Sequence, residues 1–387
     1  MAKKEDTEGL KYITDGVKHL DVQASDVLIH VINVGQGDSI LVEVGMVDSK
    51  KFYLVDGGLT CSDTPPYTNL EITLREKGLL MKKETKRETV LLDAIIITHP
   101  DEDHLGGVNK LIANYTITCP VITTEATMLT KANLTYDEPG LPEEVKLMFP
   151  TARRRIYKDI TNKTEIMKDP KFFPEPKDKS NKSNKSSILF AVVGSVLLTG
   201  DSTGQLINEA TGLGKELAET QKLRVFQVPH HGSEANSFIP YEAAKKIPST
   251  DPLHALKGKH DAYKYALFYR GIKAHTYFVS HGDHGLFQHP HRNVITGILL
   301  AAVTEETNCE LVVTGTFHQD KINYPTEAKF PGFPRNWEDY VTILDPENGD
   351  KTPYITIGRE GRPPNTKKWE PEPAARPTRA KQPAKHD

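Results

Sequence analysis

The most constraining stretch of the 387-residue chain is an apolar strand that runs into a cluster of histidines and aspartates. The β-branched run Ile95–Ile97 is typical of a buried strand. The residues after it read Thr-His-Pro-Asp-Glu-Asp-His-Leu-Gly-Gly. Two imidazoles and two carboxylates resist desolvation together unless a positive charge lies among them. A divalent metal is the usual solution, with zinc or, where oxygen ligands dominate, manganese as candidates. The alternative is a solvated acidic turn with chance histidines.

Residues of the same kinds recur where other apolar segments end. Taken alone, Asp56 before Gly-Gly is better explained as a turn cap, a common use of Asp-Gly. Strands that share the C-terminal edge of an α/β sheet place their ends together, however, and ligand sites lie there. The recurrence therefore predicts that separate segments converge on one site. The residues that end or follow predicted strands are Asp56, His99 to His104, Asp201, His230 with His231, and His281 with His284.

Composition limits the class of protein. The net charge is −3, with 26% charged and 37% apolar residues, which fits a globular protein that does not bind polyanions by bulk charge. The three cysteines form no CxxC spacing, so we expect a reducing compartment and a cytoplasmic location. The N-terminus lacks the apolar core of a signal peptide. The apolar run at 188–198 is too short to span a bilayer and predicts a β-hairpin, so no membrane association is expected.

Three parts of the chain differ in composition from the rest. Residues 1–25 form a polar N-terminal segment, and residues 319–387 form a Pro- and charge-rich C-terminal extension that we expect to be disordered at its end. Residues 131–186 are locally basic, with aromatic residues among the charges. This insertion is either a surface that contacts nucleic acid, since cations neutralise phosphates and aromatics stack on bases, or a solvated, partly disordered loop.

The motifs together resemble a metallo-β-lactamase-fold hydrolase. They are His-x-Asp-x-Asp-His with Gly-Gly, an earlier Asp-Gly-Gly, a later Leu-Leu-Thr-Gly-Asp, and Pro-His-His-Gly-Ser. The early Val-Gly-Gln-Gly-Asp-Ser-Ile and the late His289-Pro290 narrow the resemblance to the hydrolase domain of ComEC-type DNA-uptake proteins. The likeness covers residues 26–318 and lacks the transmembrane channel part, so we expect a stand-alone relative. It implies an α/β fold, a four-layer αβ/βα sandwich with a metal site between the edges of the two sheets.

The resemblance also implies the metal ligands. Asp101 stands where most of the superfamily has histidine, and Asp201 would bridge two ions. The superfamily usually has a further histidine before the hairpin, but here that place reads Asn184-Lys185-Ser186-Ser187. The first ion is therefore expected to be weakly held, or held only with substrate, and one ion rather than two stays open. The implied ligands are His99, Asp101, Asp103, His104, Asp201 and His230, with Asp56 and His231 as supporting residues that orient them.

The expected chemistry is hydrolysis by a metal-activated hydroxide, since a bound divalent ion lowers the pKa of its water to about 7. Asp101 or Asp103 would orient the hydroxide. His289 is assigned to the scissile phosphate or the leaving oxygen, with the alternative that it only precedes Pro at the start of a helix. Four further residues are weaker candidates for contact with substrate, and ordinary polar loop residues are the alternative explanation. These are Asn184, Ser187, His281 and His284.

Three functions remain open on these residues. The first is a metal-dependent nuclease or phosphodiesterase that acts on DNA, with nucleic acid as its partner. The second is a hydrolase of a small ester, lactone or thioester, because a fold does not fix its substrate. The third is a regulated component of a genome-defence assembly, with the basic insertion or the C-terminal extension as the docking element for a protein partner.

Overall fold

The computed structural model describes most of the predicted strands and helices but not the whole chain. The residues described are 26–46, 49–60, 62–82, 87–99, 101–123, 145–148, 155–156, 187, 189–192, 195–204, 207, 223–238, 249–256, 261–280, 289–314, 339–346, 351–358 and 366–368.

The first sheet is built largely from the N-terminal third of the chain. Its spatial order is β10-β8-β6-β3-β2-β1-β17. The strands β1, β2 and β3 form an antiparallel meander, and β3, β6 and β8 run parallel. The parallel strands end at one edge, as the recurrence of polar strand ends predicts. The strands are β1 (Asp26–Ile32), β2 (Ile40–Met46), β3 (Ser49–Val55), β6 (Ala94–Ile97), β8 (Val121–Thr123), β10 (Arg155–Ile156) and β17 (Tyr354–Ile357).

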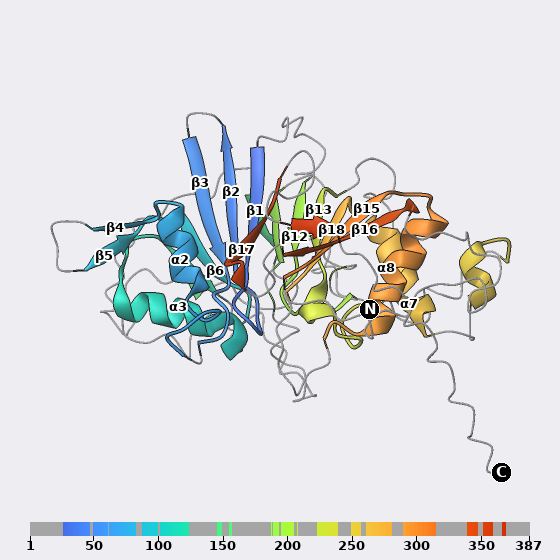
Figure 1. Cartoon of the computed structure of the whole chain (residues 1–387), viewed down its shortest axis with the longest axis horizontal. Helices are drawn as coiled ribbons and strands as arrows, with labels where there is room; N and C mark the ends of the chain where they lie inside the picture. The colour runs from blue at the N-terminus through green and yellow to red at the C-terminus, as the bar shows by residue number, and fades with distance from the viewer. Residues whose placement is uncertain are drawn as a thin grey trace, which may run out of the picture.

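The second sheet follows the first along the chain and faces it across the centre of the molecule (Figure 1). Its order is β18-β16-β15-β14-β13-β12-β11-β9, and the strands from β12 to β16 run parallel. The predicted hairpin is present as β11 and β12. The strands are β9 (Val145–Met148), β11 (Leu189–Val192), β12 (Val196–Leu198), β13 (Val225–Gln227), β14 (Thr276–Val279), β15 (Cys309–Val313), β16 (Val341–Pro346) and β18 (Thr366–Lys368).

Helices cover the outer face of each sheet (Figure 1). The helices α2 (Asn69–Glu76) and α3 (Glu102–Asn114) lie on the first sheet, and α7 (Ala262–Ile272) and α8 (Arg292–Thr304) lie on the second. One apolar cluster fills the space between the sheets, and one more lies between each sheet and its helices. These layers confirm the predicted four-layer αβ/βα sandwich.

Smaller elements complete the described fold. A three-stranded sheet joins β4 (Leu80–Lys82), β5 (Glu88–Val90) and β7 (Thr116–Ile117), and the 3₁₀ helices are η3 (Pro229–Gly232) and η4 (Pro252–Leu256). Within the described residues, no helix is long and apolar enough to cross a membrane.

The helix α8 shows what holds the outer layers in place. Residues 294–303 are buried throughout, and Ile298 and Leu299 have no exposed surface. Burial of one such side chain contributes about 1.5–3 kcal/mol. A side chain at Gly297 would overlap Tyr265 of α7, so the two helices approach closely at this glycine.

Both sheets receive strands from the regions that we assigned to the insertion and to the C-terminal extension. In the predicted extension, β16 pairs with β15 in the second sheet, and β17 pairs with β1 in the first. In the predicted insertion, β9 and β10 form one edge of each sheet. The expected N-terminal segment (1–25), most of the insertion and the end of the extension (369–387) lie outside the described residues.

Candidate metal centre

The carboxylate of Asp56, at the end of β3, orients the imidazole of His104. Its Oδ2 lies 2.8 Å from His104 Nδ1 and accepts the hydroxyl of Thr98 at 2.7 Å. Its Oδ1 accepts the Thr98 backbone N–H at 2.7 Å. Because a carboxylate only accepts, Nδ1 of His104 donates to Asp56, and Nε2 points away from Asp56.

The hydroxyl of Thr98 orients the imidazole of His99. The Thr98 hydroxyl donates a hydrogen bond to Asp56. Its oxygen can therefore accept a hydrogen bond from His99 Nδ1, which lies 3.0 Å away. The hydroxyl of Ser187, which is fully buried, lies 3.4 Å from the same nitrogen. His99 therefore also presents Nε2 to the centre of the site. This places Ser187 against a predicted ligand instead of in a position open to substrate.

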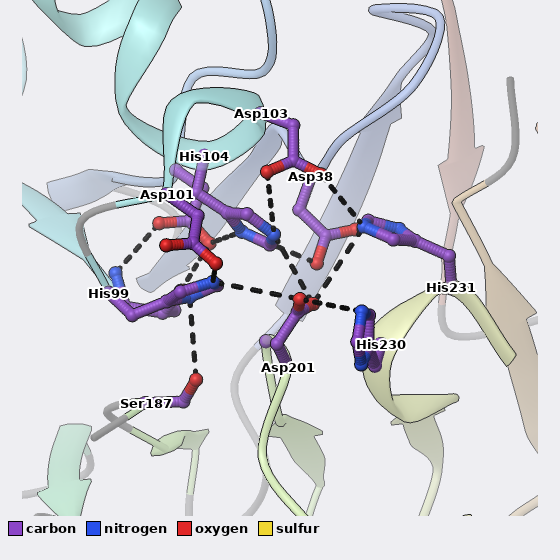
Figure 2. A network of polar contacts seen from close by, with 12 residues as sticks. Asp38, His99, Asp101, Asp103, His104, Ser187, Asp201, His230 and His231 are labelled. Carbon is purple, nitrogen blue, oxygen red and sulfur yellow. Dashed lines mark hydrogen bonds and ion pairs between the residues drawn. The ribbon is translucent and has the colours of Figure 1, made fainter. Parts of the chain in front are cut away.

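The two carboxylate oxygens of Asp201 face different histidines (Figure 2). Oδ2 lies 3.3 Å from His230 Nε2 and 3.6 Å from His99 Nε2. Oδ1 lies 3.2 Å from His104 Nε2 and 3.8 Å from His231 Nε2. Asp201 itself is 2% exposed and follows β12. This carboxylate thus lies between two sets of imidazoles, the arrangement expected of a bridging ligand.

The adjacent histidines of η3 adopt unusual backbone conformations. His230 and His231 have φ values of 50° and 53°, in the left-handed region that non-glycine residues rarely occupy. Such conformations cost about 1–3 kcal/mol each and cluster at functional sites. Here they place two imidazoles in a row, with ring centroids 5.9 Å apart, beside Asp201.

The aspartates at the start of α3 complete the ring of predicted ligands. Asp101 Oδ2 lies 3.4 Å from His99 Nε2. Asp103 Oδ2 lies 3.5 Å from His231 Nε2, and its Oδ1 lies 4.0 Å from His104 Nε2. The side chains of Asp101, Asp103 and His230 are 44%, 27% and 26% exposed, so they form the open side of the cluster.

Sequence reasoning missed Asp38 as a site residue. Its carboxylate is 1% exposed, and with His104, Asp201 and His231 it offers ligand atoms that all lie within 4.8 Å of one another. His231, which we expect to support the ligands, belongs to this group. The signal in the sequence is the Gly-Gln-Gly-Asp turn, which places this aspartate between two predicted strands.

The charges in the cluster shift its pKa values strongly. Burial opposes the charged form of His104, but Asp201, Asp56 and Asp103 outweigh it and hold the pKa of His104 well above its usual value. Burial likewise opposes ionisation of Asp201, yet the imidazoles of His104, His231 and His99 hold its pKa well below the usual value. The carboxylates therefore favour a positive charge in the cluster around Asp201.

Burial and neighbouring charges also have opposite effects on the pKa values of His231 and Asp38. Burial disfavours the charged form of His231, but Asp38, Asp103 and Asp201 raise its pKa to about 9. Burial raises the pKa of Asp38, against the opposing effect of the neighbouring imidazoles.

A divalent cation fits this donor set. The buried Nε2 atoms of His99, His104 and His231 and the buried Oδ1 of Asp201 have no hydrogen-bond partner among the described residues. Buried polar atoms are nearly always satisfied, so four such atoms directed at one another call for an ion. Imidazole nitrogen with carboxylate oxygen is the ligand chemistry of zinc and manganese sites.

Comparison with known proteins decides the family. The profile of the Metallo-beta-lactamase superfamily matches residues 32–249, more than half of the chain. The chain belongs to the metallo-β-lactamase superfamily. It is also 24% identical over 277 residues to ComE operon protein 3 of Bacillus subtilis (strain 168), an alignment that covers 69% of this chain and 30% of that protein. The chain thus spans less than a third of that relative's length.

Metallo-β-lactamase folds use divalent metals, and among the described residues the cluster around Asp201 suits one. His289 lies beside it, with its ring centroid 5.6 Å from that of His230. Burial, with the positive charge of His230 and His231, lowers the pKa of His289 to about 4. The other predicted contacts, Asn184, His281 and His284, lie outside the described residues.

Proposed function

We propose that the chain is a metal-dependent phosphodiesterase that cleaves DNA. The observation that carries this proposal is the division of Asp201 between two sets of imidazoles, with His99 and His230 at one oxygen and His104 and His231 at the other. A pair of ions suits phosphodiester cleavage because both the attacking and the leaving oxygen carry negative charge. The sequence likeness to ComEC-type DNA-uptake proteins supports DNA as the substrate.

We assign the ligands to two groups that share Asp201. His99, Asp101 and His230 would hold one zinc or manganese ion, and the second group is Asp103, His104 and His231. A bound ion supplies a Lewis acid that brings the pKa of water to about 7. Asp101 and Asp103 are partly exposed, so their outer oxygens can accept a hydrogen bond from an attacking water. His289 lies at the rim, where it would contact the scissile phosphate or the leaving oxygen.

The test uses purified protein with single- and double-stranded DNA, with added Mn²⁺ or Zn²⁺ and with EDTA. We expect cleavage that EDTA abolishes and that Asp103→Ala and His104→Ala both lose together with bound metal. The matched control is Asp63→Ala, which removes an exposed ion pair with Lys110 on α3. Turnover of a chromogenic ester without DNA cleavage would instead show a small-ester hydrolase. Metal content and cleavage unchanged in both variants would refute the site assignment.

A further inference from the structure

Backbone contacts with the start of α3 fix the position of Asp38. Its N–H donates to the carbonyl of Asp103 at 3.2 Å, which joins the β1–β2 turn to the first turn of α3. Gly37 makes this approach possible, because it has a φ of 118° and any side chain there would overlap the Asp103 carbonyl. Asp38 therefore enters the site at a defined place.

The side chain of Asp38 lies behind two imidazoles. Its Oδ1 is 3.6 Å from His231 Nδ1, and its Oδ2 is 3.8 Å from His104 Nδ1. Both histidines turn their other nitrogen, Nε2, toward Asp201. The contacts of Asp38 are thus with the ring atoms that face away from Asp201, which suits a residue that orients ligands better than one that binds the ion.

The pair Asp38–His231 has the same arrangement as Asp56–His104 at a longer distance, 3.6 Å against the 2.8 Å hydrogen bond. In both pairs a buried carboxylate lies next to Nδ1, and Nε2 is directed at Oδ1 of Asp201. A carboxylate in this position fixes the tautomer and the orientation of a metal-binding imidazole. His104 has Asp56 for this purpose, so Asp38 is left to serve His231.

Gln227 connects Asp38 to the turn that carries Asp201. Its Oε1 accepts the N–H groups of Thr199 at 2.8 Å and Gly200 at 3.0 Å, which fixes the orientation of the amide. Its Nε2 must then point the other way, and it donates to Asp38 Oδ2 at 2.6 Å. Gln227 is 1% exposed and lies at the end of β13, so it spans the gap between the two sheets.

We propose that Asp38 is a positioning residue that orients His231 toward the metal, and that Gln227 sets Asp38 relative to Asp201. The pair fixes the position of His231 relative to Asp201, because Asp38 lies in the turn between β1 and β2 of the first sheet and Gln227 lies in β13 of the second. This inference rests on the metal centre of the proposed function but not on DNA as its substrate.

Exchange of the carboxylate and the amide between residues 38 and 227 tests this proposal. Asp38 accepts a hydrogen bond from Gln227 Nε2, and its other oxygen lies 3.6 Å from His231 Nδ1. Asparagine in D38N offers one acceptor oxygen, so one donor must face its amide NH₂. In the double variant D38N/Q227E, the asparagine NH₂ donates to the new carboxylate, and its oxygen is free to accept from His231. The other glutamate oxygen still accepts from the N–H groups of Thr199 and Gly200.

The measurement is the zinc affinity of the full chain, by competition with a chromogenic chelator, with thermal unfolding in EDTA as a separate record of folding. We expect D38N to weaken binding about 10–100-fold, as loss of an orienting partner does. The double variant should recover about tenfold of that loss, since the two residues form one network. If D38N does not fold, the affinity of the double variant decides alone.

The matched control is E43Q. Glu43 is a buried carboxylate of the first sheet that lies 3.5 Å from Nε2 of His30, away from the metal centre. Zinc affinity should not change in E43Q. The proposal is overturned by wild-type affinity in D38N, by an equal loss in E43Q, or by a double variant that binds no better than D38N, which would make Asp38 a direct ligand. Zinc binding without DNA cleavage in the wild type would refute only the substrate.

Discussion

His104 Nδ1 lies 2.8 Å from Asp56 Oδ2, although 48 residues separate the two in the chain. The contact joins the end of β3 to α3. Because it leaves Nε2 of His104 directed at Asp201, the relation between these two residues determines whether the imidazole can bind a metal.

Replacement of Asp56 by asparagine should therefore weaken metal binding. The carboxylate of Asp56 accepts hydrogen bonds at both oxygens. In asparagine one of these two atoms is an NH₂ group, which donates and cannot accept. We expect about 10–100-fold lower affinity for zinc, measured by chelator competition. Asp93→Asn is the control, because Asp93 accepts from the backbone N–H of Phe52 but does not contact the site. Equal effects in the two variants would show a general loss of structure.

The two sides of Asp201 predict distinct metal stoichiometries. His99→Ala should remove the ion at Oδ2 and leave the ion at Oδ1, and His231→Ala should do the reverse. Asp201→Ala should remove both, because each ion shares its carboxylate. Elemental analysis of the protein after equilibration with excess Zn²⁺ and gel filtration measures the ions per chain. A wild-type ratio of two that stays at two in His99→Ala would contradict the division.

The buried pair His30 and Glu43 predicts how stability depends on pH. Burial lowers the pKa of His30 below 6.5, so the unfolded chain binds this proton at a higher pH than the folded chain, and the contribution of His30 to stability falls as the pH drops below 6.5. The hydrogen bond to His30, with Lys50 as a further partner, lowers the pKa of Glu43 from 4.5 to about 2. Its contribution is therefore present above pH 4.5 and is lost as the pH falls toward 2.

Urea unfolding in EDTA between pH 7 and pH 3 tests this dependence. The free energy of unfolding should fall as the pH drops below about 4.5, where the unfolded glutamate takes up its proton, and Glu43→Gln should flatten this part of the curve. A variant with the same slope as the wild type in that lower range would show that Glu43 does not carry the effect.

Gly107 should tolerate no side chain. Its N–H donates to the carbonyl of Gly58 at 2.8 Å, and an added carbon would overlap the carbonyl of Gly57. Gly107→Ala should destabilise the fold by about 1–3 kcal/mol and weaken metal binding, because α3 must move away from Asp56. Gly271→Ala in α7 is the control, since no atom lies within 4 Å of the added carbon. Thermal unfolding and zinc affinity are the measurements.

The sequence predicted the strands that end in possible metal ligands. It did not predict a site residue whose contacts are with residues far away in the chain. The apolar strand before His99 and the polar residues after it were visible in one short window. Asp38 was not, because a single aspartate after Gly-Gln-Gly is an ordinary turn residue. What makes it part of the site is burial and a hydrogen bond to Gln227, 189 residues away.

The strands of the C-terminal region show a different limit. Tyr354–Ile357 alternates between half-buried and buried residues, as a strand should. It is only 4 residues long, however, and lies in a region rich in proline and charge, which favours the prediction of an extension. Its pairing with β1 depends on the whole sheet and could not be obtained from so short a run.

The pairing of β16 with β15 and of β17 with β1 has a practical consequence for work with shortened chains. A chain ended at residue 318 would leave the backbone N–H and C=O groups of β1 and β15 without these neighbours. Open strand edges recruit other chains, so such a fragment is expected to aggregate even though every candidate ligand is still present.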